Sequence, residues 1–143
     1  MRALLAAAPE ADIVPVGAAA PATLPTSDAE PTLDAERLVV YQVALELQAL
    51  ASGLVPATQR VLHDQMERAS LSCVLLIAEG AGRRSRKDKR RFYAMARGST
   101  CECAAAVDVL RQRRLAPEAA CAAARSLALR VIQMLTKLDR ALG

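Results

Sequence analysis

The sequence predicts an all-α protein, an antiparallel up-down-up-down four-helix bundle behind a disordered N-terminal extension. Apolar residues recur at spacings of three and four in four successive segments, which is the period of one helical face. Hydrophobic residues make up 53% of the 143 residues but aromatic residues only 2%, so the apolar content is mostly Ala, Leu and Val. These residues suit close helix–helix contact. Pro56 and Pro117 stand where helices would end or begin.

Residues 1–33 hold five of the seven prolines, together with Ala, Thr, Ser and acidic residues. Such a segment buries too little apolar surface to offset its chain entropy, so we expect disorder there and a bundle domain over residues 34–143. A signal peptide is the alternative, because Met1-Arg2 precedes an apolar run. That run ends at Pro9-Glu10, at the short edge of an export signal. No apolar stretch reaches the ~20 residues of a membrane span, so we expect a cytoplasmic protein without membrane contact.

The first helix is expected to begin near Thr32 or Asp34, either of which could cap it, and to end at Gly53 and Pro56. Its main apolar face has the members Val40, Val43, Leu47, Leu50 and Leu54.

The second helix is expected from Ala57 to Glu79. Its seam is predicted to be Leu62, Met66, Ala69, Cys73, Leu76 and Gly80. Between Leu71 and Ala78 the segment is apolar nearly all round, more than one bundle core can cover. We therefore expect an oligomer interface at Leu71, Val74 and Leu75. Cover by the first segment or by a long loop is the alternative.

Gly80 is expected in the left-handed position of a Gly80-Ala81-Gly82 turn, and Ser85 is expected to cap the third helix with Asp88 in a capping box. The third seam is predicted to be Phe92, Ala96, Ser99, Cys103, Ala106 and Leu110. Pro117 opens the fourth helix. Its seam is predicted to be Ala120, Ala124, Leu127, Val131, Met134, Leu138 and Ala141. Short connections make neighbouring helices antiparallel.

Charge is unevenly distributed, since residues 37–143 hold 18 bases and nine acids, whereas residues 1–36 hold one base and six acids. The strongest local feature is a run with seven basic residues among nine: Arg83, Arg84, Arg86, Lys87, Lys89, Arg90 and Arg91. Cations at a helix start oppose the helix dipole by about 0.3–1 kcal/mol each. The run therefore suits phosphates better than it suits the helix, although a merely solvated loop remains the alternative. With Phe92 in the core, only Tyr93 is spare for base stacking, which favours backbone contacts with weak sequence preference.

Two acidic residues, Glu79 and Glu102, are expected to have polar partners within the bundle. Glu79 lies at the C-terminus of the second helix, where the dipole disfavours an anion, and Arg68, Arg83 and Arg97 are candidate partners. Glu102 falls one turn after Ser99 and is interpreted as an inter-helix polar contact. Paired carboxylates can serve acid–base chemistry, but no His, Asp or Cys is arranged around these two. The sequence therefore predicts no catalytic residues and no enzyme.

The four cysteines do not form a metal motif. Cys101 and Cys103 fall on roughly opposite sides of a helix, and His63 is the only histidine. We expect all four cysteines, including Cys73 and Cys121, to be free thiols in a reducing cytosol. We expect no metal and no cofactor.

Several separated motifs resemble one known family. They are Val40-Tyr41-Gln42 with Ala44, Gln65-Met66-Glu67-Arg68-Ala69-Ser70, Ser72, Ile77-Ala78-Glu79-Gly80, Phe92, Ala96-Arg97-Gly98-Ser99 and Glu102. Over residues 36–142 their order and spacing resemble the 23S rRNA intervening-sequence proteins, also labelled ribosomal-protein-like. The family usually has Asn where this chain has Leu76, so a polar contact made by that Asn is missing here.

The resemblance implies a four-helix bundle that assembles as a ring, usually of five subunits, without catalytic residues. It also suggests binding to structured, rRNA-associated RNA, for which the basic run supplies the contacts. The alternative is a ring-shaped scaffold for a protein partner. The accessory protein of diversity-generating retroelements, which works with a reverse transcriptase, is a relative of this second kind. The expected partners are thus a second copy of the chain and either RNA or a protein.

Overall fold

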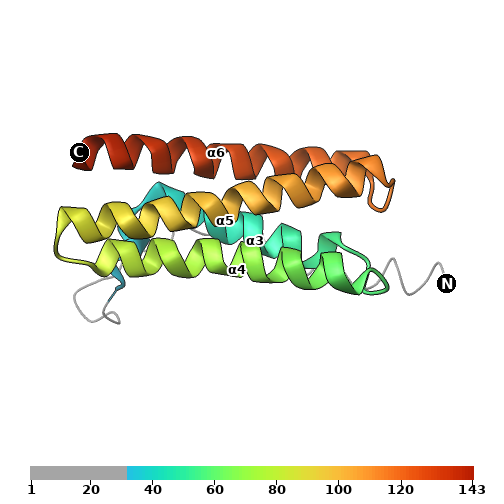
Figure 1. The fold of residues 1–143 in the computed structure, drawn as a ribbon, viewed down its shortest axis with the longest axis horizontal. Helices are drawn as coiled ribbons and strands as arrows, with labels where there is room; N and C mark the ends of the chain where they lie inside the picture. Colours follow the sequence, from blue (N-terminus) through green and yellow to red (C-terminus); the bar gives the residue numbers. More distant parts are fainter. Residues whose placement is uncertain (1–31) are drawn as a thin grey trace. The chain divides into compact units, whose positions relative to one another are not determined.

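Four α-helices and one 3₁₀ turn make up residues 32–143, the part of the chain that the computed structural model describes (Figure 1). Their bounds are η2 Asp34–Arg37, α3 Val39–Leu54, α4 Arg60–Gly82, α5 Arg86–Gln112 and α6 Glu118–Leu142. The all-α prediction is confirmed. The predicted disorder of residues 1–33 falls, for residues 1–31, outside the described residues.

Each helix packs against the next one along the chain, and α6 closes the bundle against α3. The short connections make the helices alternate in direction, as the up-down-up-down prediction requires. The α4–α5 turn and the C-terminal end of α6 therefore lie at one end of the bundle, on the left in Figure 1. The α3–α4 and α5–α6 connections lie at the opposite end.

The first helix begins differently from the prediction. Leu38 has an extended backbone (φ −99°, ψ 124°) and separates η2 from α3, whose N-cap it forms. The Glu36 carboxylate accepts a hydrogen bond from the Leu33 N–H at 3.0 Å, which satisfies one donor at the start of η2. Neither Thr32 nor Asp34 caps α3, so that expectation is wrong. The 3₁₀ turn forms instead because it buries Ala35, and η2 packs against both α3 and α4.

The core consists of two apolar clusters arranged along the bundle. The first contains Val40, Val43, Ala44, Leu47, Cys73, Val74, Ile77, Tyr93, Ala96, Ala128, Val131 and Leu135. The second contains Ala51, Leu54, Val55, Met66, Ala69, Cys103, Ala106, Val107, Leu110, Cys121 and Ala124. Ala, Val and Cys dominate both sets, and their small side chains let the helices approach closely.

The buried face of α4 is wider than the predicted seam and is displaced from it. Val74 is 7% exposed and Ile77 is fully buried, whereas the seam residues Leu62 and Leu76 are only half-buried. The cause is that α4 packs against α3 on one side and α5 on the other. Val74 therefore belongs to the core of its own chain, which corrects its placement outside the seam. Leu71 and Leu75 remain exposed, at 47% and 57%.

Gly80 and Gly82 are both helical, so the predicted glycine turn is wrong. No glycine among residues 32–143 has a positive φ, and α4 continues to Gly82. A Cβ on Gly80 would lie 2.8 Å from Tyr93 Cε1 and 3.0 Å from Phe92 Cβ. Glycine is required at this position by the close approach of α4 and α5, and the backbone conformation there is ordinary.

The ends of α5 are closed by local hydrogen bonds. The Ser85 hydroxyl accepts from the Asp88 N–H at 3.0 Å, which confirms the predicted N-cap. At the other end Arg114 adopts a positive φ of 54°. The Leu115 N–H bonds the Leu110 carbonyl at 2.9 Å and the Arg114 N–H bonds the Arg111 carbonyl at 3.1 Å, which is the Schellman pattern. Pro117 is the N-cap residue of α6.

Candidate nucleic-acid interface

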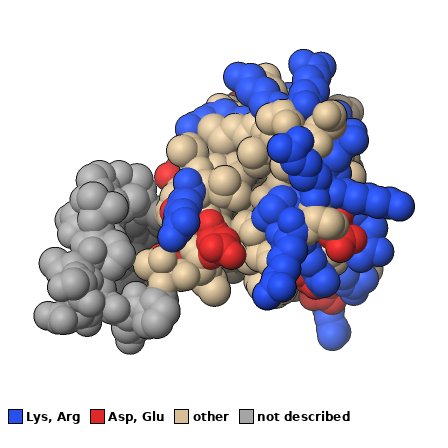
Figure 2. Space-filling view, turned by 90° about the vertical axis from the view of Figure 1, so that its left-hand side faces the viewer, with Lys and Arg blue, Asp and Glu red and all other residues tan. Residues whose placement is uncertain are grey.

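The basic run lies at the bundle end that holds the α4–α5 turn. Arg83 is the C-cap of α4, Ser85 is the N-cap of α5, and Arg84 lies between them. The remaining five bases occupy the first two turns of α5. Figure 2 views this end of the bundle and shows Lys and Arg side chains around much of it, with fewer Asp and Glu among them. We call this surface the basic end.

Three of the seven bases in the run make contacts that stabilise the fold. Arg83 forms an ion pair with Glu79, one helical turn before it. The Lys89 ammonium donates to the Ala81 carbonyl at 2.7 Å and lies 3.5 Å from the Gly80 carbonyl, so it caps the C-terminus of α4.

Arg90 joins α5 to α6 through Asp139. Its Nε and Nη2 donate to the two carboxylate oxygens at 2.8 and 3.3 Å, which is a bidentate pair. The hydrogen bond from Arg90 holds the pKa of Asp139 below its ordinary value. The pair fixes the C-terminal turn of α6 beside the start of α5.

The other four bases are exposed and make no hydrogen bond or ion pair with residues 32–143. We call these four the outward bases: Arg84, Arg86, Lys87 and Arg91. The Arg91 guanidinium lies 5.0 Å from the centre of the Phe92 ring, and that of Arg83 lies 4.6 Å from it. The outward bases thus present four positive charges to solvent at the start of one helix.

Further cations reach the same end from other elements and lie outside the run that the sequence singles out. Arg37 is the last residue of η2, and Lys137 and Arg140 lie in the last two turns of α6; all three are exposed. Alternation of helix direction brings these termini together (Figure 1). Combining the predicted topology with the charges at each helix end would have identified them.

No aromatic side chain in residues 32–143 is available for stacking at the basic end. Phe92 is 6% exposed and Tyr93 is 4% exposed, and Tyr93 belongs to the first core cluster. The expectation that Tyr93 is spare is therefore wrong, because the close approach of α4 at Gly80 covers its ring. The remaining aromatic, Tyr41, is half-buried against the core.

The predicted polar residues of α4 and α5 form contacts across the two helices. The Gln65 amide donates to Glu102 at 3.1 Å, and the Ser99 and Ser72 hydroxyls are 3.1 Å apart. Below them the Thr100 hydroxyl bonds Cys73 Sγ at 3.0 Å. The Arg68 side chain is exposed and takes part in none of the hydrogen bonds among residues 32–143.

The thiols are separated into one exposed and three buried groups. Cys101 is exposed, whereas Cys73, Cys103 and Cys121 are buried. Burial is the main cause that raises the pKa of Cys103 to about 12, which keeps this thiol protonated and unreactive at neutral pH. Within residues 32–143 no three His, Cys, Asp or Glu side chains are grouped as metal ligands.

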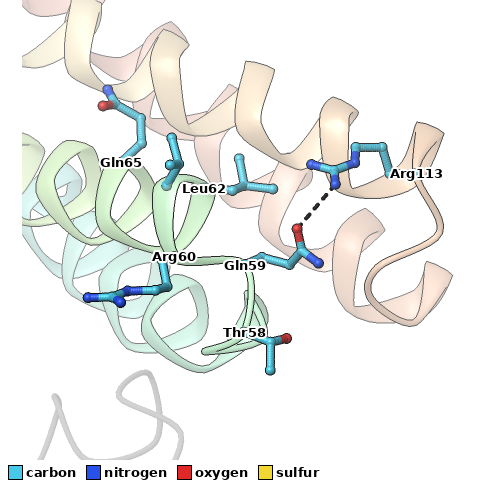
Figure 3. Close-up of a pocket in the computed structure, with 7 residues that line it drawn as sticks. Thr58, Gln59, Arg60, Leu62, Gln65 and Arg113 are labelled. Carbon is cyan, nitrogen blue, oxygen red and sulfur yellow. Dashed lines mark hydrogen bonds between the residues drawn. The ribbon is translucent and has the colours of Figure 1, made fainter.

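An open pocket lies at the opposite end of the bundle (Figure 3). It is lined by Thr58, Gln59, Arg60, Val61, Leu62, Gln65 and Arg113. The Arg113 guanidinium donates to the Gln59 amide oxygen at 3.1 Å and so ties the end of α5 to the start of α4. This arginine is thus used within the fold, and the basic end has more unpaired charge than the pocket.

None of the helices in the described part of the chain has the length and apolarity needed to cross a membrane. Residues 36–137 match the model of a protein family described as 23S rRNA-intervening sequence protein. A search of curated proteins returned no match. The family match spans all four helices, from η2 into the last turns of α6.

Proposed function

We propose that this chain, which belongs to the family of 23S rRNA-intervening sequence proteins, is a non-enzymatic protein that binds structured RNA through its basic end. One observation supports this most directly. Three bases of the run form hydrogen bonds or ion pairs within the bundle, whereas the four outward bases form neither with the described residues.

The outward bases carry an energetic cost that the fold does not offset. Arg86 and Lys87 lie in the first turn of α5, where each cation opposes the helix dipole by about 0.3–1 kcal/mol, and their mutual repulsion adds to this. Phosphates reverse the sign of both effects, because an anion is favoured at a helix N-terminus and screens the neighbouring cations. Binding an anionic polymer therefore accounts for charges that folding alone does not.

The test is RNA binding by a variant in which Arg84, Arg86, Lys87 and Arg91 are all replaced by Gln. The slope of log affinity against log salt concentration should become less negative by about 0.7–0.9 for each phosphate that the variant no longer binds. Affinity should fall similarly for unrelated sequences, because phosphate contacts carry little sequence information. Thermal stability should stay equal or rise slightly.

The matched control replaces four exposed arginines outside the basic end, Arg60, Arg68, Arg114 and Arg130, and so changes the net charge equally. This variant should keep most of the RNA affinity. Unchanged RNA affinity in the outward-base variant, or an equal reduction in the control, would contradict binding at the basic end.

A second candidate function is an oligomeric scaffold for a protein partner. It is favoured by exposed apolar side chains on α4 and α5, namely Leu71, Leu75 and Met95. We propose that the chain self-associates through this face. The expected number of subunits is five, and the expected location is the cytoplasm. A scaffold predicts saturable binding to one protein that tolerates salt, in contrast to the steep salt dependence expected for RNA.

A further inference from the structure

Resting on the proposed function, we infer that the RNA bound at the basic end is double-helical, and that the protein recognises stems in preference to single-stranded loops. The inference follows from which side chains the basic end exposes and which it buries.

Proteins that hold single strands without reading sequence usually stack bases on aromatic rings, each worth about 1–3 kcal/mol. The whole chain has three aromatic residues, and all three lie in the bundle. Phe92 and Tyr93 are buried, and Tyr41 packs against the core. Unpaired bases would therefore gain no aromatic platform, whereas bases in a duplex are already stacked on one another.

Arginine guanidinium planes can also stack on unpaired bases. Two of the arginines at this surface already face a ring, since Arg83 and Arg91 lie 4.6 and 5.0 Å from the centre of Phe92. Arg83 is further fixed by its ion pair with Glu79. Among the outward bases only Arg84 and Arg86 keep a free guanidinium plane, whereas all four offer the ligand positive charge, which matches the phosphates along a helical stem.

The backbone that carries the outward bases is fixed on both sides. The Ser85 hydroxyl caps α5, Lys89 caps α4, and Arg90 holds α6 through Asp139. Charges carried on a fixed backbone fit a duplex, whose phosphates are already ordered, better than a flexible strand that must be ordered on binding. The groove of an RNA duplex that displays most base-edge information is deep and narrow, so such binding should be indifferent to sequence.

The experiment compares the full-length protein on a blunt-ended RNA duplex, on each of its separated strands, and on the matching DNA duplex, by fluorescence anisotropy. The RNA duplex should bind about tenfold or more tightly than either strand, and permuting its sequence should change the affinity less than about threefold. An Ala94→Tyr variant places a ring on the exposed face of α5, one turn beyond Arg91, without changing charge. This variant should bind single strands more tightly than the parent does, so the difference in affinity between the RNA duplex and its separated strands should become smaller.

Single strands that bind as tightly as the duplex, still dependent on the outward bases, would overturn the inference and leave the proposed function standing. Tighter binding of the DNA duplex would overturn the assignment to RNA. Absence of binding to every RNA form would overturn the proposed function and this inference together.

Discussion

Gly80 shows how one residue without a side chain sets the spacing of two helices. Its α-carbon faces Phe92 and Tyr93, and an added Cβ would lie 2.8 Å from the Tyr93 ring. A Gly80→Ala variant should lose about 1–3 kcal/mol of unfolding free energy, because the Tyr93 ring belongs to the core and cannot move aside freely. Denaturant titration measures this.

Gly98 supplies the control, since it lies in the interior of α5 and a Cβ there meets no atom within 4 Å. Gly98→Ala should therefore stabilise the protein by up to about 1 kcal/mol. Equal effects of the two substitutions would show that helix propensity, and not helix spacing, determines the need for Gly80.

Cys103 makes the fold sensitive to alkaline pH. Burial, followed by the nearby Cys73 and Glu102, raises its pKa from the ordinary 9.0 to about 12. Between pH 9 and 12 the unfolded chain loses this proton while the folded chain keeps it, so the stability due to the protonated thiol is full below pH 9 and falls as pH rises. Burial also raises the pKa of Cys73 and Cys121, which adds to the same trend.

Thiol labelling checks which of the four cysteines are buried and which is exposed. At pH 8 the native protein should react quickly at one thiol per chain, Cys101, and at all four after denaturation. A Cys101→Ser variant should have no fast thiol. Rapid labelling of a second thiol in that variant would mean that the core opens locally at neutral pH.

At the scale of elements, Lys89 and Lys87 lie within one helical turn of each other, but only the Lys89 side chain forms a hydrogen bond within residues 32–143. Lys89 donates to the carbonyls at the end of α4, whereas Lys87 is exposed. A Lys89→Met variant should lose about 0.5–1.5 kcal/mol of stability because the Ala81 carbonyl no longer has its partner. Lys87→Met should leave stability equal or slightly higher and should weaken RNA binding. The reverse pattern, measured by thermal unfolding and anisotropy, would contradict both assignments.

The C-terminal turn of α5 contains a residue in an unfavourable conformation. Arg114 holds a positive φ of 54° in a Schellman motif, a position at which glycine avoids the steric cost of a Cβ. Arg114→Gly should stabilise the protein by about 0.5–1 kcal/mol, as measured by its melting temperature. The neighbouring Arg113→Gly, at a right-handed position with φ −89°, should not stabilise it.

The sequence predicts the elements of this fold better than it predicts their ends. Periodic apolar residues and the Ser85 cap act within one helix, so they can be read locally. The role of Gly80 could not be predicted from its neighbours in the sequence, because a glycine required for helix–helix contact has the same local signature as one that ends a helix. The burial of Tyr93 escapes prediction for a related reason: it depends on the missing Cβ of a residue on another helix.

The candidate site divides in the same way. Seven bases in nine residues indicate an anion-binding surface from the sequence alone. Which of them are outward depends on Glu79, Asp139 and the carbonyls at the end of α4, and these groups belong to α4 and α6. Tertiary contacts therefore decide which charges are available to a ligand.

At the scale of the whole molecule, the bundle offers two surfaces of different chemistry. The basic end is polar and charged, whereas the outer surface of α4 and α5 exposes Leu71, Leu75 and Met95. Oligomerisation through the apolar surface would repeat the basic end in every subunit. Modest phosphate contacts would then add through effective concentration, so assembly and RNA affinity should be coupled.

A Leu75→Glu variant tests this coupling. Leu75 is 57% exposed within its own chain, so the substitution should leave the fold of the bundle intact. If Leu75 lies in a subunit interface, the change buries an unpaired carboxylate there and should dissociate the oligomer. The molecular mass measured by light scattering should then fall from a multiple of 15.2 kDa to 15.2 kDa, the mass of one chain. RNA affinity should fall with it by about tenfold or more, because binding is then no longer multivalent although every outward base remains.

The control for this variant is Val61→Glu, which introduces the same charge at another exposed apolar position, in the first turn of α4. It should keep the mass and most of the RNA affinity of the parent, since Val61 lies near the opposite end of α4 from the basic end. A parent protein that is already monomeric at micromolar concentration would contradict self-association. A dissociated Leu75→Glu variant with full RNA affinity would show that single bundles bind RNA on their own, and that assembly serves another purpose.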